Sequence, residues 1–130
     1  MNVIDSSAWI EYVQNGRQAG TIETYLVGAD LLVPTVVIYE VYKFTRREGS
    51  EELARRAVMR MKEGLVVPLD ESLAMEAADV SLERGLHFAD AVVYATAQRY
   101  GALLVTGDQH FAGLPGVEYL AGDAALPTNH

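Results

Sequence analysis

The chain has 130 residues, half of them hydrophobic, with no cysteine and a formal net charge of −8. This composition suits one globular domain and excludes a disordered tail, and the lack of cysteine excludes a disulfide scaffold, a thiolate zinc site and thiol catalysis. The start, M-N-V-I-D, lacks the features of a signal peptide, and no apolar run approaches the ~20 residues that span a bilayer. We therefore expect a soluble cytoplasmic protein with a single domain over 1–130, in which 122–130 form a frayed tail.

Short apolar segments alternate with longer segments of helical periodicity along the chain. Strands are predicted at Asn2–Ile4, Leu31–Val33, Leu65–Leu69, Ala102–Val105 and Val117–Leu120, and helices at 7–15, 19–28, 35–48, 50–63, 71–84 and 89–100. Glycines close several of these helices, as Gly85 and Gly101 do. Strands that alternate with helices need crossover connections. The pattern therefore predicts an α/β fold in three layers, with a mainly parallel central sheet flanked by helices.

The basic residues are concentrated in the segment 43–62. This segment holds seven of the ten lysines and arginines together with three glutamates, so it carries +4 (7 − 3), and the rest of the chain carries −12 (−8 − 4). Two solvated helix faces with intrahelical pairs such as Glu52–Arg56 would explain the segment. A basic surface beside an acidic pocket would explain it equally, provided that the acids elsewhere form a site.

Four acidic residues stand at or within apolar segments. They are Asp5 in N-V-I-D-S-S, Glu40 in V-V-I-Y-E-V-Y, Asp90 in H-F-A-D-A-V-V and Asp108 in L-L-V-T-G-D. Burial of an unpaired charge is expensive, and ligands of parallel sheets bind at the carboxyl ends of the strands. If the fold brings the four acids together, their roughly four negative charges require divalent cations or a cationic partner. The pattern predicts a metal site that handles phosphate.

Each of these acids also has an ordinary structural explanation. Asp5 and Asp90 would stabilise helix N-termini, Asp108 would occupy a turn, and Glu40 would pair with Lys43. The set as a whole favours a site, because a carboxylate inside the apolar run around Glu40 is a poor choice for packing alone.

The same four segments, in order, resemble the motifs of PIN-domain ribonucleases, specifically the VapC-type toxins of bacterial and archaeal toxin–antitoxin pairs. The segments are V-I-D-S-S-A-W-I, V-P-T-V-V-I-Y-E-V, L-H-F-A-D-A-V-V-Y-A-T-A and L-L-V-T-G-D-Q-H-F. The resemblance covers nearly the whole chain and implies a catalytic, metal-binding set of four acids, Asp5, Glu40, Asp90 and Asp108. It also implies that hydroxyl groups of Ser6 or Ser7 and of Thr106 support the site.

Oxygen ligands select a hard cation, so Mg²⁺, with Mn²⁺ as a substitute, is expected in preference to zinc. The resemblance implies an endoribonuclease that hydrolyses the phosphodiester in line with a metal-activated water and leaves 5′-phosphate and 3′-hydroxyl ends. Glu40 would complete the site or position the water. The family often has another charged residue after the fourth acid, where this chain has Gln109 and His110. His87 and His110 would either contact the site or act as polar surface and capping groups.

Lys43, Arg46 and Arg47 are the candidate RNA-binding residues. On a helix, Glu40, Lys43 and Arg47 fall on one stripe, so the cations lead away from the acid and suit contacts with phosphates. The resemblance further implies a cognate antitoxin protein whose tail places an arginine or lysine in the acidic pocket and covers exposed apolar surface. It also implies a homodimer and no membrane partner.

Two other functions are compatible with parts of the sequence. A catalytically inert PIN-like module would bind RNA or protein without cutting it. A receiver-type phosphoacceptor domain is also an α/β sandwich of similar length, in which Asp70 after V-V-P-L would be phosphorylated. The chain lacks the acidic pair on the first strand and the lysine near the last strand that a receiver domain requires.

Overall fold

The computed structural model describes residues 1–27 and 30–121, and its five strands form one parallel sheet. The strands are β1 (Asn2–Ile4), β2 (Leu31–Pro34), β3 (Leu65–Val67), β4 (Leu103–Thr106) and β5 (Val117–Tyr119). They lie in the order β3-β2-β1-β4-β5. The predicted α/β class with a parallel sheet is confirmed.

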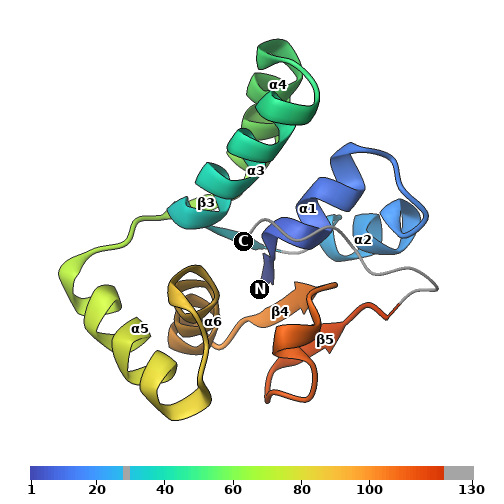
Figure 1. Ribbon diagram of the computed structural model, residues 1–130. Helices are drawn as coiled ribbons and strands as arrows, with labels where there is room; N and C mark the ends of the chain where they lie inside the picture. The colour runs from blue at the N-terminus through green and yellow to red at the C-terminus, as the bar shows by residue number, and fades with distance from the viewer. Residues whose placement is uncertain (28–29, 122–130) are drawn as a thin grey trace.

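Helices cover both faces of this sheet. They are α1 (Ser6–Val13), α2 (Ala19–Leu26), α3 (Thr35–Glu48), α4 (Glu51–Met61), α5 (Glu71–Arg84), α6 (Phe88–Tyr100) and the short 3-10 helix η1 (Gln109–Phe111). Figure 1 shows α1 and α2 on one side of the sheet and α5 and α6 on the other, with α3 and α4 as a helical pair that extends away from it. The predicted three-layer arrangement is confirmed.

The predicted helix boundaries agree with the structure to within one or two residues. The bounds of α3 and α5 are as predicted, and α5 has clear end signals. The Asp70 side chain accepts a hydrogen bond from the Leu73 amide at 2.8 Å, and Gly85 adopts a left-handed conformation with φ of 71° at the other end. Residue 28 of the predicted helix 19–28 and the predicted frayed tail lie outside the described residues. Within 1–27 and 30–121, no helix is long and apolar enough to cross a bilayer.

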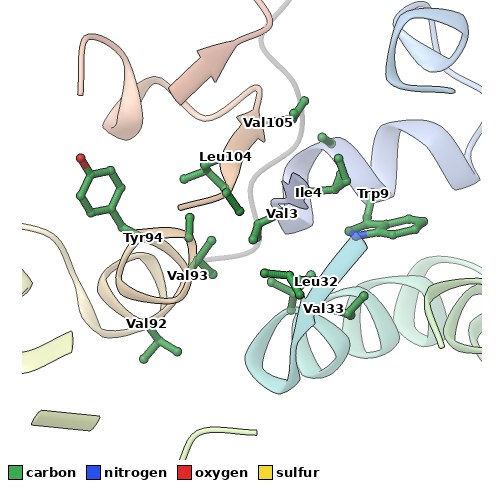
Figure 2. Close-up of a cluster of buried hydrophobic side chains, with 14 of the residues drawn as sticks. Val3, Ile4, Trp9, Leu32, Val33, Val92, Val93, Tyr94, Leu104 and Val105 are labelled. Atoms are coloured by element: carbon green, nitrogen blue, oxygen red, sulfur yellow. The ribbon is translucent and has the colours of Figure 1, made fainter. Parts of the chain in front are cut away.

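Side chains that alternate along the central strands fill the two layers of the core. Val3 of β1 pairs in register with Leu104 of β4, and both side chains are fully buried. Figure 2 shows them on the side of the sheet where Val93 of α6 packs, with Ile4 on the opposite side towards Trp9 of α1. Because side chains alternate along each strand, the same pattern indicates which helical layer the residues at the carboxyl end of the strand face.

Candidate active site

Asp5 and Thr106 lie side by side at the point where the strand order reverses. The chain places β2 and β3 on one side of β1 and then β4 and β5 on the other, and ligands of open parallel sheets bind at such a point. Ile4 pairs with Val105, and the Asp5 amide donates to the Val105 carbonyl at 2.9 Å. By the alternation of side chains, Asp5 and Thr106 face the layer that contains α6.

The Asp5 carboxylate is buried and only half satisfied by hydrogen bonds. Its exposed fraction is 1 %. Thr106 Oγ1 donates to Asp5 Oδ2 at 2.8 Å and Ser7 Oγ donates to the same oxygen at 3.1 Å, whereas Asp5 Oδ1 is buried without a hydrogen-bond partner. Burial raises the pKa of Asp5, the negative charge of Asp108 adds to the increase, and the hydrogen bonds oppose it. One oxygen of the Asp5 carboxylate is thus buried without a hydrogen-bond partner.

Two hydroxyl groups tie the ends of β1 and β4 to the turn that follows β4. Thr106 Oγ1 accepts from the Asp108 amide at 2.9 Å, Ser7 Oγ accepts from the Gly107 amide at 3.2 Å, and the two hydroxyl oxygens are 3.4 Å apart. The Thr106 hydroxyl therefore links Asp5 to the turn at Asp108, and its role in supporting a catalytic site stays a prediction. The second hydroxyl comes from Ser7. The Ser6 side chain is buried as well, and its backbone lowers the pKa of Asp5 against the larger increase that burial causes.

Asp90, Asp108 and His110 form a second cluster next to Asp5. Asp90 lies in the first turn of α6, and Asp108 begins η1 by accepting a hydrogen bond from the His110 amide at 2.9 Å. The His110 Nδ1 atom lies 3.2 Å from Asp108 Oδ1 and 3.6 Å from Asp90 Oδ2. One potential metal-binding atom from each of the three residues lies within 4.8 Å of the others.

Glu40 is buried on α3, with an exposed fraction of 4 %. The helix α3 packs against both α1, which carries Ser7, and α6, which carries Asp90. The helix that carries Glu40 thus lies next to the helices that carry Ser7 and Asp90. Thr106 links Asp5 to Asp108, and Asp108 clusters with Asp90. The catalytic role of these acids and of Glu40 stays a prediction.

The chemical nature of these donors fits a hard divalent cation. Carboxylate oxygens dominate the cluster, and such ligands suit Mg²⁺ and Mn²⁺. The buried Asp5 Oδ1 atom, which has no hydrogen-bond partner, is an oxygen that a cation would satisfy. The Asp5 carboxylate, with an exposed fraction of 1 %, is costly to keep ionised, and a bound cation would offset that cost.

The candidate RNA-binding residues line a hollow on α3 that also contains two tyrosines. The hollow has a volume of about 410 Å³ and is lined by Tyr39, Tyr42, Lys43, Arg46 and Arg47. Lys43 Nζ lies 5.5 Å from the centroid of the Tyr39 ring, which is 61 % exposed. The two tyrosines are uncharged, so the stripe of charged residues in the sequence did not indicate them.

Several residues of the basic segment 43–62 form surface ion pairs with neighbouring glutamates. Glu51 pairs with Arg46 at 3.3 Å and with Arg55 at 2.8 Å, and the predicted pair Glu52–Arg56 is present at 3.3 Å. These pairs lie on the surface and do not prevent the cations from contacting phosphate, because exposed ion pairs are weak.

A large groove has none of the four acids in its lining. A groove of about 1040 Å³ separates α1 and α2 from the end of α3 and from α4, and Tyr12, Val13, Leu53 and Ala57 are among its lining residues. Leu53 is half exposed there. The groove offers an extended, partly apolar surface.

Comparison with known protein families shows which family the chain belongs to. The sequence model of the PIN domain matches residues 3–117. The chain belongs to the PIN domain family. The resemblance predicted from the four motifs is therefore confirmed at the level of the family. A search of curated proteins gave no significant match.

Solved structures with the same fold include toxins of toxin–antitoxin pairs. A toxin–antitoxin complex from Klebsiella pneumoniae has a chain 22 % identical to this PIN domain, with 91 % of this chain and 96 % of that chain covered and a TM-score of 0.76. VapC20 from Mycobacterium tuberculosis, a toxin that cleaves the sarcin–ricin loop, is 19 % identical over 91 % and 98 %, with a TM-score of 0.74. DNA-bound VapBC from Salmonella typhimurium is 15 % identical over 92 % and 96 %, with a TM-score of 0.73. At these identities the similarity establishes the fold.

Proposed function

We propose that this PIN domain is a divalent-metal-dependent endoribonuclease and the toxin of a toxin–antitoxin pair. The observation that carries the proposal is the Asp5 carboxylate, buried with one oxygen held by Thr106 and Ser7 and the other without a hydrogen-bond partner. This carboxylate stands beside Asp108 and the Asp90 cluster at the end of the sheet where ligands bind. The fold shared with toxins such as VapC20 supports the same reaction.

Each residue of the site has a distinct task in this proposal. A bound Mg²⁺ would orient a water molecule, lower its pKa and neutralise charge that develops on the phosphodiester oxygens. Asp5, Asp90 and Asp108 would hold the cation directly or through water. Thr106 and Ser7 fix the orientation of Asp5 so that its free oxygen remains available. Glu40 would complete the site or position the attacking water for in-line hydrolysis.

The hollow on α3 is the proposed path of the RNA. Lys43, Arg46 and Arg47 would contact phosphates, which positions RNA without reading its sequence. The exposed Tyr39 ring beside Lys43 would stack on an unpaired base, as aromatic rings do in proteins that bind single strands. The substrate class that fits this surface is a single-stranded or looped RNA.

The proposed partners are a cognate antitoxin and a second copy of the chain. An antitoxin would cover apolar surface such as the groove at Leu53 and Ala57 and place an arginine or lysine among the buried acids. The toxin complexes among the related folds support this arrangement. We expect the protein to act in the cytoplasm. The homodimer is retained as a prediction.

Cleavage of a mixed RNA pool by the pure protein tests the proposed activity. The reactions contain Mg²⁺, chelator, or Asp90→Asn protein in Mg²⁺. Discrete cuts that disappear with chelator and with the variant are expected. Cutting that survives both controls would contradict the metal site, and RNA that is bound but never cut, even with Mn²⁺, would favour the inert PIN-like module.

The receiver-type alternative receives no support from the position of Asp70. This residue follows the edge strand β3, and its side chain accepts from the Leu73 amide as the cap of α5. A phosphoacceptor must instead present its carboxylate to a phosphodonor, with neighbouring acids that hold Mg²⁺. In this chain the clustered acids lie beyond β1 and β4.

A further inference from the structure

The side chain of His110 lies close to two of the buried acids, although it is itself half exposed. Its Nδ1 atom is 3.2 Å from Asp108 Oδ1 and 3.6 Å from Asp90 Oδ2. Two ligands at right angles on an octahedral ion with bonds of about 2.1 Å are about 3.0 Å apart. The imidazole nitrogen therefore lies close to this ligand spacing from Asp108 Oδ1 and somewhat beyond it from Asp90 Oδ2.

The backbone holds His110 in this place independently of its side chain. The His110 amide donates to Asp108 Oδ1 at 2.9 Å, and the next residue, Phe111, is completely buried. Phe111 anchors η1 in the core, while the His110 side chain is half exposed on the other side of the same turn. The imidazole is thus positioned at the rim of the site, between the acids and solvent.

The buried Asp5 carboxylate is a separate observation that favours a cation at this site. Asp5 Oδ1 has no hydrogen-bond partner although it is buried, and the Thr106 hydroxyl that donates to Asp5 Oδ2 also accepts from the Asp108 amide. A cation bound between Asp5 and the cluster of Asp90, Asp108 and His110 would satisfy that oxygen.

We infer that His110 supplies an imidazole nitrogen to the same cation that Asp90 and Asp108 hold, so that the site favours divalent transition metals over Mg²⁺. This inference rests on the proposed function. Mg²⁺ prefers oxygen ligands and loses its water reluctantly, whereas the affinity of mixed nitrogen and oxygen sites rises along the first-row metals from Mn²⁺. One nitrogen among carboxylates therefore shifts the preference without excluding Mg²⁺.

Pulsed electron paramagnetic resonance of bound Mn²⁺ tests the inference without reference to activity. The wild-type protein with Mn²⁺ should show coupling to ¹⁴N, and growth with ¹⁵N-labelled histidine should convert it to ¹⁵N coupling in a protein with no substitution. His110→Asn, which offers an oxygen in place of the nitrogen, should lose the coupling. His87→Asn, a change of another exposed histidine, should retain it.

Calorimetric titration provides the matching thermodynamic result. His110→Asn should weaken Mn²⁺ binding by about tenfold and leave Mg²⁺ binding within about twofold, because only the first ion gains from the nitrogen. Mn²⁺ that binds without nitrogen coupling, or equal losses for the two metals, would overturn the inference and leave the proposed nuclease intact. A wild-type protein that binds neither metal would overturn the proposed function itself.

Discussion

The acids at the ends of β1 and β4 and the bases of the α3–α4 pair form two charged regions that differ in burial. Asp5, Asp90 and Asp108 are 1–2 % exposed, whereas the side chains of Arg47 and Arg55 are 56 % and 70 % exposed. Charges in the interior interact strongly and are costly to leave unpaired. Charges on the surface are screened by water and salt, and their pairs contribute little.

This difference assigns separate roles to the two regions. The buried acids have positions fixed by named hydrogen bonds, so each single change should have a large effect. The exposed bases together generate a positive electrostatic potential, so each single substitution should have only a small effect on RNA binding or stability, and that effect should depend on salt. Four substitutions, two in each region, test whether the contrast holds.

Substitution of Asp5 by asparagine should have the largest effect on activity. It removes a charge from the proposed metal site, where the cation contributes several kcal/mol to transition-state stabilisation, so single-turnover cleavage should fall by about 10³-fold. Asp70→Asn is the matched control, because Asp70 caps α5 and asparagine caps a helix equally well. Comparable losses in both variants would indicate that the acidic cluster has no special role.

Removal of the Thr106 hydroxyl should have the next largest effect. Thr106→Val leaves the Asp108 amide and Asp5 Oδ2 without their Thr106 partner, which should lower the free energy of unfolding by about 1–3 kcal/mol. Urea denaturation of Thr106→Val and Thr106→Ser measures this, because serine keeps the hydroxyl and loses only a methyl group. A serine variant as destabilised as the valine variant would attribute the effect to packing.

Substitution of Lys43 by alanine should weaken RNA binding moderately and change its salt dependence. Loss of one phosphate contact with single-stranded RNA lowers the slope of log K against log salt by about 0.7. Binding is measured in an Asp90→Asn background so that the RNA stays intact, with Arg55→Ala as the control outside the hollow. An unchanged slope in Lys43→Ala would remove this residue from the RNA path.

Substitution of Glu51 by glutamine should have the smallest effect. Hydrogen bonds from Arg55 and then Arg46 hold the pKa of Glu51 below its usual value, so its stabilising contribution is present at neutral pH and is lost as the pH falls. Because these groups are exposed, Glu51→Gln and wild type should unfold at nearly the same temperature at pH 7. A large difference in unfolding temperature at pH 7 that vanished at pH 3 would show that the ion pairs of Glu51 contribute substantially to stability, contrary to what is expected of exposed charges.

The sequence predicted the elements of this fold well because their signals are local. The periodic patterns of α3 and α5 and the end signals Asp70 and Gly85 determine their bounds within a few residues. The helix η1 was missed, because three residues are too few for a periodic pattern. The order β3-β2-β1-β4-β5 is a property of contacts between distant segments and leaves no local signal.

The site was predicted in part for the same reason. Asp5 and Asp108 follow apolar strands, so the sequence marks them as candidates for the site. The structure brings Asp108 together with both Asp5 and Asp90. The choice between Ser6 and Ser7 needs the orientation of α1, because consecutive residues on a helix point about 100° apart. His110 had only its position near Asp108 to mark it, and its distance from Asp90 depends on how α6 packs beside β4.

Thermal unfolding of wild type and Asp5→Asn, with chelator and with Mg²⁺ at pH 7, tests most directly the claim that the acids are arranged for a cation. Burial raises the pKa of Asp5, so its ionised form destabilises the metal-free protein as the pH rises above the unfolded value. Asp5→Asn should therefore unfold at a higher temperature in chelator, by on the order of 5 °C for ~1 kcal/mol. Mg²⁺ should raise the wild-type temperature above that of the variant. A wild-type protein that Mg²⁺ does not stabilise would contradict the account.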